Sequence, residues 1–323
     1  MRILVTGGSG FLGLALTDAL ARRGDTVISA DLGPPPAELQ AARSPLIDAR
    51  RLDITDAAAI RALLGDTTPD VIVHAAAATP DGAREAGGDA AAIVAVNIGG
   101  TANIIEAATE TGTYVIALSS VAIYGRTLAD TARLHEDMPP NPQILYAITK
   151  AAAETLALRL GMVHSVPVCT PRIGILWGAW EHRTSLRATP SPAFAIYATA
   201  RGGQDVVLPE AASAPLLHVD GAVAALIAAI DAKATGIVNI GAPASVALAE
   251  FAGHVARHYG VDARVDPAAA NIALFAINRP PTDNTRLRLA TGHDIPAFDP
   301  VLIAAHADWL DKHYGTPVSQ SAI

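Results

Sequence analysis

Short apolar runs alternate with longer stretches of helical periodicity over the first half of the chain. Residues 3–6 and 26–30 are brief runs rich in β-branched side chains, which is typical of buried strands. Residues 11–23 between them carry apolar positions at helical spacing and are followed by Gly24, a common residue at a helix C-terminus. Strands that are apolar throughout and alternate with helices predict a parallel sheet covered on both faces.

This alternation extends to about residue 240, with one irregular interruption at residues 177–215, which mix Trp, Arg, His and Pro. Further strands are predicted at residues 46–52, 70–75, 114–119, 166–175 and 236–240, and a strand–helix pair at 216–231. Further helices are predicted at residues 56–64, 89–111, 146–160, 248–259 and 301–313. Because crossovers between parallel strands are right-handed, this order predicts an α/β fold with a doubly wound parallel sheet. Residues 1–175 are predicted to form the sheet domain, with 216–240 returning to it, and residues 176–215 and 241–323 a smaller, interleaved second domain.

Composition narrows the class of protein. About 51% of the 323 residues are hydrophobic, which is enough to fill a sizeable core and excludes a disordered chain. The formal net charge of -8 argues against a nucleic-acid binder, which would carry a basic face. The mean hydropathy is +0.32, yet no apolar run approaches the roughly 18–20 residues of a membrane-spanning helix. We therefore expect no nucleic-acid partner and no membrane partner.

The chain has one cysteine, Cys169, so an intrachain disulfide and a cysteine-based metal cluster are excluded and no metal site is predicted. Glycines interrupt the N-terminal segment from Gly7 onward, before the apolar core of a signal peptide could form. Both observations predict a cytoplasmic protein.

A glycine-rich turn follows the first predicted strand. Gly7, Gly10 and Gly13 have the spacing that lets a strand turn sharply into a helix whose N-terminal amides face a pyrophosphate. The alternative is an ordinary glycine-rich turn, but its position between strand and helix favours dinucleotide binding. Asp31 ends the second strand about 20 residues later, where an acid accepts hydrogen bonds from the adenosine ribose and repels a 2′-phosphate. This predicts NAD rather than NADP, the alternative being a helix cap or loop acid.

Asp53 and Ile54 follow the third predicted strand and suit the adenine, with the carboxylate accepting from the adenine amino group. The alternative for Asp53 is an N-cap of the following helix. The sequence leaves both interpretations open.

Tyr146 and Lys150 lie four residues apart on one face of a predicted helix. A neighbouring ammonium favours the phenolate and moves the tyrosine towards a usable general base. The pair alone is weak evidence, but Ser120 ends the fifth strand, at the sheet edge where ligands bind in open α/β folds. Ser120 is therefore predicted to orient the reacting oxygen beside Tyr146.

Six segments together resemble the extended short-chain dehydrogenase/reductase superfamily, in its NAD-dependent epimerase/dehydratase branch. They are residues 6–13, 74–77, 96–103, 119–125, 146–150 and 218–220, in the order in which the family carries them. The resemblance implies a Rossmann-type fold, a smaller C-terminal substrate-binding domain and NAD as cofactor. It also implies catalysis by Ser120, Tyr146 and Lys150. The implied cofactor-binding residues are Gly7, Gly10, Phe11, Leu12, Gly13, Asp31, Asp53, Ile54, Ala75, Ala76, Ala77, Asn97 (as a brace), Leu118, Tyr146, Lys150, Pro171 and Ile173.

The sequence also departs from the family's patterns. Dehydratases of this branch place Asp-Glu after the catalytic hydroxyl, where this chain has Val121 and Ala122, so we reject a dehydratase. We also reject epimerase–reductase chemistry by a Cys/His pair, because Cys169 lies within a predicted strand. Nucleotide-sugar enzymes carry an Asn where this chain has Ile175, and an arginine for the diphosphate where it has residues 213–215. The predicted substrate-binding residues are Ser120, Val121, Arg172, Arg183, Arg187 and Arg279.

Three functional hypotheses remain. The leading one is an NAD-dependent dehydrogenase acting on a secondary alcohol or lactol carbon of a sugar or sugar acid, a small-molecule carbohydrate. The second is a UDP-sugar 4-epimerase that holds NAD tightly. The third, a non-catalytic dinucleotide-sensing protein, is disfavoured because Tyr146 and Lys150 are both present. The resemblance further predicts a homodimer formed through the helices around residues 89–111 and 146–160.

Overall fold

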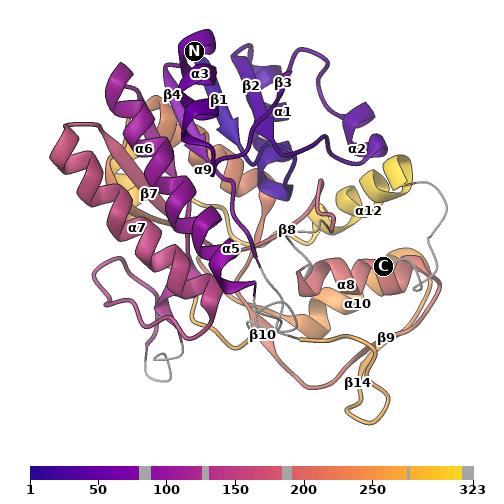
Figure 1. Cartoon of the computed structure of the whole chain (residues 1–323). Helices are drawn as coiled ribbons and strands as arrows, with labels where there is room; N and C mark the ends of the chain where they lie inside the picture. Colours follow the sequence, from indigo (N-terminus) through magenta and orange to yellow (C-terminus); the bar gives the residue numbers. More distant parts are fainter. Residues whose placement is uncertain (80–88, 126–130, 184–190, 275–276, 315–323) are drawn as a thin grey trace.

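A parallel sheet of eight strands organises the computed structural model, which describes residues 1–79, 89–125, 131–183, 191–274 and 277–314 (Figure 1). The strand order is β12-β7-β5-β4-β1-β2-β3, with β6 paired to β7, and every pairing is parallel. The strands are β1 (Arg2–Thr6), β2 (Thr26–Asp31), β3 (Asp48–Arg51), β4 (Val71–His74), β5 (Tyr114–Ala117), β6 (Ser119–Ser120), β7 (Val168–Ile173) and β12 (Gly236–Ile240). The strand order reverses between β1 and β4, as in a doubly wound Rossmann-type fold.

Helices cover both faces of this sheet because its strands are apolar on both sides. Ile3 and Val5 of β1 pack in one core with α1 (Phe11–Arg23) and α9 (Val219–Asp231). Leu4, between them, points to the opposite core. That core includes α3 (Ala57–Thr67), α6 (Gly100–Thr111) and α7 (Leu145–His164), with α6 and α7 side by side in Figure 1. The predicted α/β architecture is confirmed.

The structure corrects the predicted third strand and the long helix. The strand is confined to Asp48–Arg51, whose residues are all exposed because β3 is the edge of the sheet. The helix over residues 89–111 is continuous but contains a π-helical turn, η1 (Ala95–Gly99), between α5 (Ala90–Val94) and α6.

This same stretch, Ala90–Thr111, is long and apolar enough to span a membrane by length and composition, with a mean hydropathy of 1.4. The prediction that no stretch approaches this length was therefore wrong by that criterion. The helix packs against α3 and α7 in the structure, and core helices of many folds meet the same criterion. It is weak evidence for a membrane-spanning segment.

The segment predicted to be irregular contains regular elements of a second core. These are α8 (Pro192–Arg201), β9 (Val206–Leu208) and β10 (Ser213–Ala214). The start of α8 carries signals that the prediction overlooked, because Ser191 accepts from the amide of Phe194 and Pro192 occupies the first helical turn.

These elements pack with more C-terminal ones, in the lower right of Figure 1. The partners are β13 (Val246–Ala247), α10 (Leu248–Tyr259), β14 (Ala263–Val265) and α12 (Val301–Tyr314). The ring of Trp177 lies 5.1 Å from that of Phe251 and 6.3 Å from that of Tyr197, between centroids. Two short parallel strands, β8 (Ile175–Trp177) and β11 (Leu216–His218), connect this core to the sheet.

Two short helices were not predicted. α2 (Ala37–Ala42) follows the Pro34–Pro36 segment and contacts α12 of the second core. α11 (Thr285–Thr291) lies in the segment predicted for the second domain, yet it packs against α9 and β12 of the sheet. The buried Leu287 of α11 belongs to the core that α1 and α9 form.

Candidate active site

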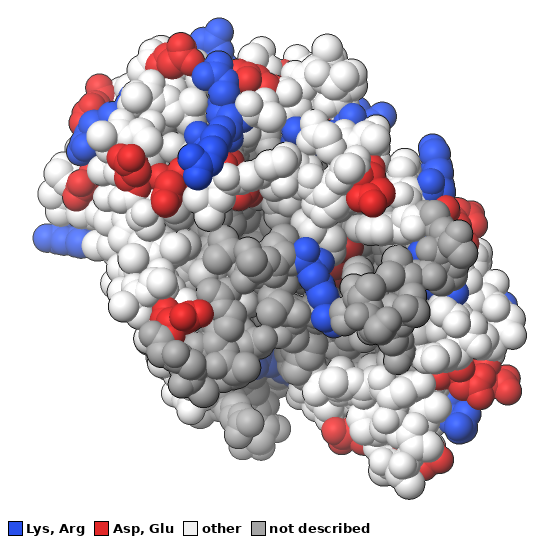
Figure 2. Space-filling view, turned by 45° about the vertical axis from the view of Figure 1, so that its right-hand side comes forward, with Lys and Arg blue, Asp and Glu red and all other residues white. Residues whose placement is uncertain are grey.

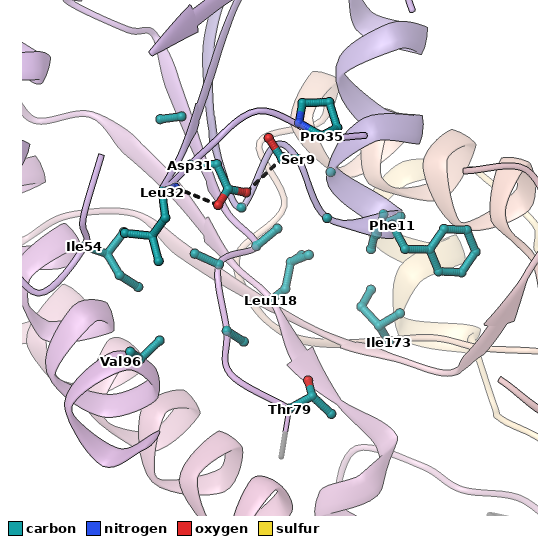
Figure 3. Close-up of a pocket in the computed structure, with 18 of the residues that line it drawn as sticks. Ser9, Phe11, Asp31, Leu32, Pro35, Ile54, Thr79, Val96, Leu118 and Ile173 are labelled. Atoms are coloured by element: carbon teal, nitrogen blue, oxygen red, sulfur yellow. Dashed lines mark hydrogen bonds between the residues drawn. The ribbon is translucent and has the colours of Figure 1, made fainter. Parts of the chain in front are cut away.

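A cavity of about 860 Å³ lies where the carboxyl ends of β1, β2, β4, β5 and β7 meet (Figure 3). The predicted residues that line it are Gly7, Gly10, Phe11, Leu12, Gly13, Asp31, Asp53, Ile54, Ala75, Ala76, Ala77, Leu118, Ser120, Tyr146, Lys150, Ile173 and Arg183. The fold thus brings the predicted dinucleotide and catalytic residues to one cavity.

The glycine turn leaves no room for a side chain at Gly7 or Gly13. Gly7 has a φ of +71°, and a Cβ there would lie 2.5 Å from the amide nitrogen of Ala76. A Cβ on Gly13 would lie 2.0 Å from the carbonyl oxygen of Gly7. The described residues provide no side-chain cap for α1 and no acid in its first turn, so its N-terminus suits an anionic pyrophosphate.

Asp31 is fixed at the end of β2 by two backbone amides. Its carboxylate accepts hydrogen bonds from the amides of Ser9 at 2.9 Å and Leu32 at 2.7 Å (Figure 3). Burial raises the pKa of this carboxyl, while the two amides and nearby His182 act in the opposite direction. The fixed carboxylate lines the cavity and can accept hydrogen bonds from ribose hydroxyls.

Asp53 does not cap a helix, so that alternative is wrong. Its carboxylate accepts from the amide and hydroxyl of Thr55, at 2.9 and 2.7 Å, and the residue lines the cavity. Asp56 caps α3 instead, accepting from the amides of Ala58 and Ala59.

The three predicted catalytic side chains come from two elements that meet at the cavity. Tyr146 and Lys150 lie in the first turns of α7, and Ser120 ends β6. The Lys150 ammonium donates to the carbonyl of Leu118 and is 6% exposed. Burial lowers the pKa of Lys150 to about 8, and the carboxylate of Glu154 opposes this shift. Lys150 is therefore still mainly charged at neutral pH, as the chemistry with Tyr146 requires.

Asn97 lies behind the lining residues rather than among them. Its side chain accepts from the amide of Ala78 at 2.7 Å and donates to the Ala78 carbonyl at 3.0 Å and to the Thr149 hydroxyl at 2.9 Å. It thereby joins the segment after β4 to α7, one residue before Lys150. This is the arrangement expected of a brace.

Several other predicted site residues do not line the cavity. Pro171 is buried within β7, and Val121 is 6% exposed in the 3-10 turn η2 (Val121–Tyr124). Arg279 is half-buried elsewhere, and Arg187 lies outside the described residues. The structure also corrects the prediction for Arg172, which is 2% exposed and bound to protein groups. Its position rules out direct contact with a ligand in this cavity.

Some lining residues were not predicted from the sequence. Ser9, Pro35, Thr79 and Val96 line the cavity (Figure 3). His182 also lines the cavity, is 5% exposed, and lies close enough to Asp31 to act on the pKa of that carboxyl. The turn before it is unusual: Trp180 has a φ of +75°, and its carbonyl accepts from Nδ1 of His182 at 2.9 Å. The sequence could not show that this turn brings His182 close to Asp31.

Charge on the visible face is not concentrated in one region. Figure 2 shows acidic and basic side chains interspersed over the part of that face that the structure describes. The net charge of -8 therefore says little about the ligand, and recognition of an anion depends on a few local groups.

The sheet, the glycine turn, Asp31 and the Ser120–Tyr146–Lys150 set define a dinucleotide-dependent protein that can move a proton at a substrate oxygen. The family model "NAD dependent epimerase/dehydratase family" matches residues 3–241, so the chain belongs to that family and its cofactor is NAD.

Known relatives catalyse different reactions on nucleotide sugars. The dTDP-L-rhamnose 4-epimerase of Burkholderia thailandensis is 25% identical over 297 residues, covering 80% of this chain and 81% of that protein. The dTDP-glucose 4,6-dehydratase of Mycolicibacterium smegmatis is 33% identical over 191 residues, but the match covers 56% of this chain and 55% of that protein. The solved UDP-glucose 4-epimerase of Thermus thermophilus, in complex with NAD, has a TM-score of 0.79 and 23% identity. That alignment covers 96% of this chain and 98% of the other, and it shows a shared fold.

Proposed function

We propose that this protein is an NAD-dependent dehydrogenase that oxidises a secondary alcohol or lactol carbon of a sugar or sugar acid. The observation that carries the proposal is the convergence of Ser120, Tyr146 and Lys150 on the cavity that also holds the glycine turn and Asp31. Family membership and the enzymatic relatives support an enzyme that acts on a carbohydrate.

The residues of this chain have distinct roles in the proposed reaction. The Lys150 ammonium stabilises the phenolate form of Tyr146, and this phenolate takes the hydroxyl proton of the substrate and becomes the neutral phenol. Ser120 holds the reacting oxygen beside Tyr146. The glycine turn and Asp31 would hold the pyrophosphate and the adenosine ribose of NAD, and the bound cofactor would supply the acceptor for the hydride of the substrate carbon.

The choice of a sugar or sugar acid rests on missing diphosphate contacts. Ile175 lines the cavity where nucleotide-sugar enzymes resembling this chain carry an Asn. Residues 213–215 hold no arginine, and Arg279 lies away from the lining residues. Arg183 does line the cavity and is exposed, so it is available for a carboxylate.

A UDP-sugar 4-epimerase is the second candidate, favoured by the epimerases among the relatives. The two functions differ in net redox change. Purified protein incubated with NAD and a panel of aldonic acids, uronic acids and free sugars should produce NADH with at least one of them. Tyr146→Phe serves as the inactive control. Absence of NADH with every compound, together with interconversion of a UDP-sugar, would favour the epimerase.

We also propose a cytoplasmic homodimer. Ile148, Met162 and Val163 on α7 are 48%, 73% and 54% exposed, and Val94 on the neighbouring helix is 41% exposed. These apolar side chains suit contact with a second copy through helices on this side of the sheet. Light scattering should give a dimer mass for the native chain and a monomer mass for Ile148→Glu/Met162→Glu. A monomeric native chain contradicts the proposal. Cell fractionation tests the location.

A further inference from the structure

Arg172 lies behind the catalytic groups and contacts both of the structural units that carry them. Its Nε and Nη2 donate to the two carboxylate oxygens of Glu154, at 3.0 and 2.7 Å. Its Nη1 donates to the hydroxyl of Tyr124 at 2.9 Å and to the carbonyl of Glu136 at 3.2 Å. All the contacts leave from one guanidinium on β7.

The first of these units is α7. Tyr146, Lys150 and Glu154 lie at intervals of four residues, so they follow one another along one face of this helix. The side chain of Glu154 is 4% exposed and is held at both oxygens. Fixing Glu154 therefore fixes the direction in which the catalytic face of α7 points.

The second unit is the strand end that carries Ser120. Tyr124 is the last residue of the turn η2, which begins directly after Ser120, and it is 1% exposed. Its hydroxyl donates to Oδ1 of Asn239 on β12 at 2.7 Å, and the guanidinium carbon of Arg172 lies 4.8 Å from the centre of its ring. Fixing Tyr124 therefore limits the movement of Ser120.

We propose that Arg172 is a positioning residue that sets the placement of Ser120 relative to Tyr146 by holding Tyr124 and Glu154 at the same time. This inference rests on the catalytic roles given to Ser120 and Tyr146 under the proposed function. A buried ion pair contributes little net stability, because both charges lose their water. The two parallel hydrogen bonds between a planar guanidinium and a carboxylate do fix the orientation of the two side chains relative to each other. A pair of apolar side chains cannot do this.

The test is the double variant Arg172→Met/Glu154→Met, which removes both charges together and leaves neither buried alone. We expect its melting temperature and NAD affinity to stay close to those of the native chain. With a substrate identified, kcat should fall about tenfold or more with little change in KM, since a small misplacement of reacting groups is costly. An unchanged kcat in a folded double variant would overturn the proposal.

A second readout needs no substrate. The tyrosinate absorbance of the protein minus that of its Tyr146→Phe counterpart isolates the titration of Tyr146. We expect this titration to move to higher pH in Arg172→Lys, which keeps the Glu154 carboxylate that supports the Lys150 charge, because a displaced Ser120 hydroxyl would stabilise the Tyr146 phenolate less. A titration that matches the native one would overturn the proposal, whether or not the enzyme acts on sugars.

Two controls are needed. The first tests whether the positive charge at position 172 is sufficient without the contacts to both partners, and the second tests whether the loss of any ion pair has the same effect. Arg172→Lys keeps the positive charge but cannot hold both partners, so it should show the same loss as the double variant. Full activity in Arg172→Lys would mean that bridging is unnecessary and would contradict the proposal. The ion pair of Arg201 and Asp311 joins α8 to α12 at 2.6 Å, and Arg201→Met/Asp311→Leu should leave kcat and the Tyr146 titration unchanged.

Discussion

The ammonium of Lys150 donates a hydrogen bond to the carbonyl oxygen of Leu118, at the carboxyl end of the central strand β5. This contact ties α7 to the sheet edge where the cavity opens. It also keeps a charged group in a buried position. Burial lowers the pKa of the neighbouring His74 to about 3, and the charge of Lys150 adds to this shift. The N-terminal part of α7 is thus joined to the sheet through a buried ammonium group, that of Lys150.

Lys150→Met should change the pH dependence of stability. The pKa of Lys150 falls from 10.5 to about 8 on folding, so between these values the unfolded chain binds more protons than the native one. Unfolding free energy in the native sequence therefore rises with pH across this window, by about 3 kcal/mol at most. Lys150→Met lacks this rise. Denaturant unfolding should be measured for both proteins without NAD at several values from pH 7 to 10. As the pH rises, the free energy of unfolding of the native chain should increase relative to that of Lys150→Met. Parallel pH curves would contradict the buried, charged Lys150.

Tyr146→Phe should remove activity while leaving NAD binding intact. In the proposed reaction the phenolate of Tyr146 accepts the substrate proton, so its loss should reduce kcat by roughly 100- to 10,000-fold. The ring remains to line the cavity, so the dissociation constant for NAD, measured by calorimetry, should be nearly unchanged. Substantial residual turnover would show that another group is the base.

Gly13→Ala should weaken NAD binding strongly. The new Cβ would meet the carbonyl of Gly7 at 2.0 Å, so the glycine turn or α1 must move, at a cost of about 1–3 kcal/mol. Gly33→Ala is the matched control, because Gly33 also lines the cavity but no atom lies within 4 Å of its added Cβ. Equal NAD affinities for the two variants would show that the turn is not the pyrophosphate site.

Asp31→Asn tests the ribose contact. An amide has one acceptor oxygen for the two amides of Ser9 and Leu32 and carries no charge for the ribose hydroxyls. The affinity for NAD should fall about 10- to 100-fold, as for a lost charge-assisted hydrogen bond, and discrimination against NADP should weaken. Asp53→Asn, measured in the same way, tests whether Asp53 contacts the adenine. An unchanged affinity in Asp31→Asn would remove Asp31 from the cofactor site.

As the pH is lowered, NAD binding should begin to weaken at a higher pH than the ordinary pKa of an aspartate would predict. Burial raises the pKa of Asp31, so this carboxylate takes up its proton at higher pH than a free one as the pH falls. The dissociation constant for NAD, measured from pH 7 downward, should begin to rise above the usual aspartate range. Asp31→Asn should show no such dependence. Identical pH profiles for the two proteins would contradict this role.

Local patterns were enough to predict most of the sheet and its cofactor turn. The helix from Phe11 to Arg23 and its glycine stop at Gly24, with a φ of +96°, matched the prediction because helix periodicity and left-handed backbone both depend on neighbouring residues. The second core was harder. Its strands of two or three residues are shorter than a period-2 pattern needs, and α8 lies in a segment that mixes Trp, Arg, His and Pro with alanine-rich stretches.

Sequence patterns alone predicted the class of protein. The glycine turn and the Tyr146–Lys150 pair are each formed by residues within a few positions of one another, and the order of short strand and helix patterns predicted the sheet that brings Ser120 to the same edge. Which charged side chains line the cavity, and which are bound to other protein groups behind it, depends on the tertiary structure. Arg172, predicted to contact a substrate, lies behind the catalytic residues in an ion pair with Glu154, 18 positions away. His182 lies near Asp31 in the cavity, although the two residues are far apart in the sequence. The partner that a charged side chain meets depends on how distant segments pack, and a local sequence pattern carries no information about that.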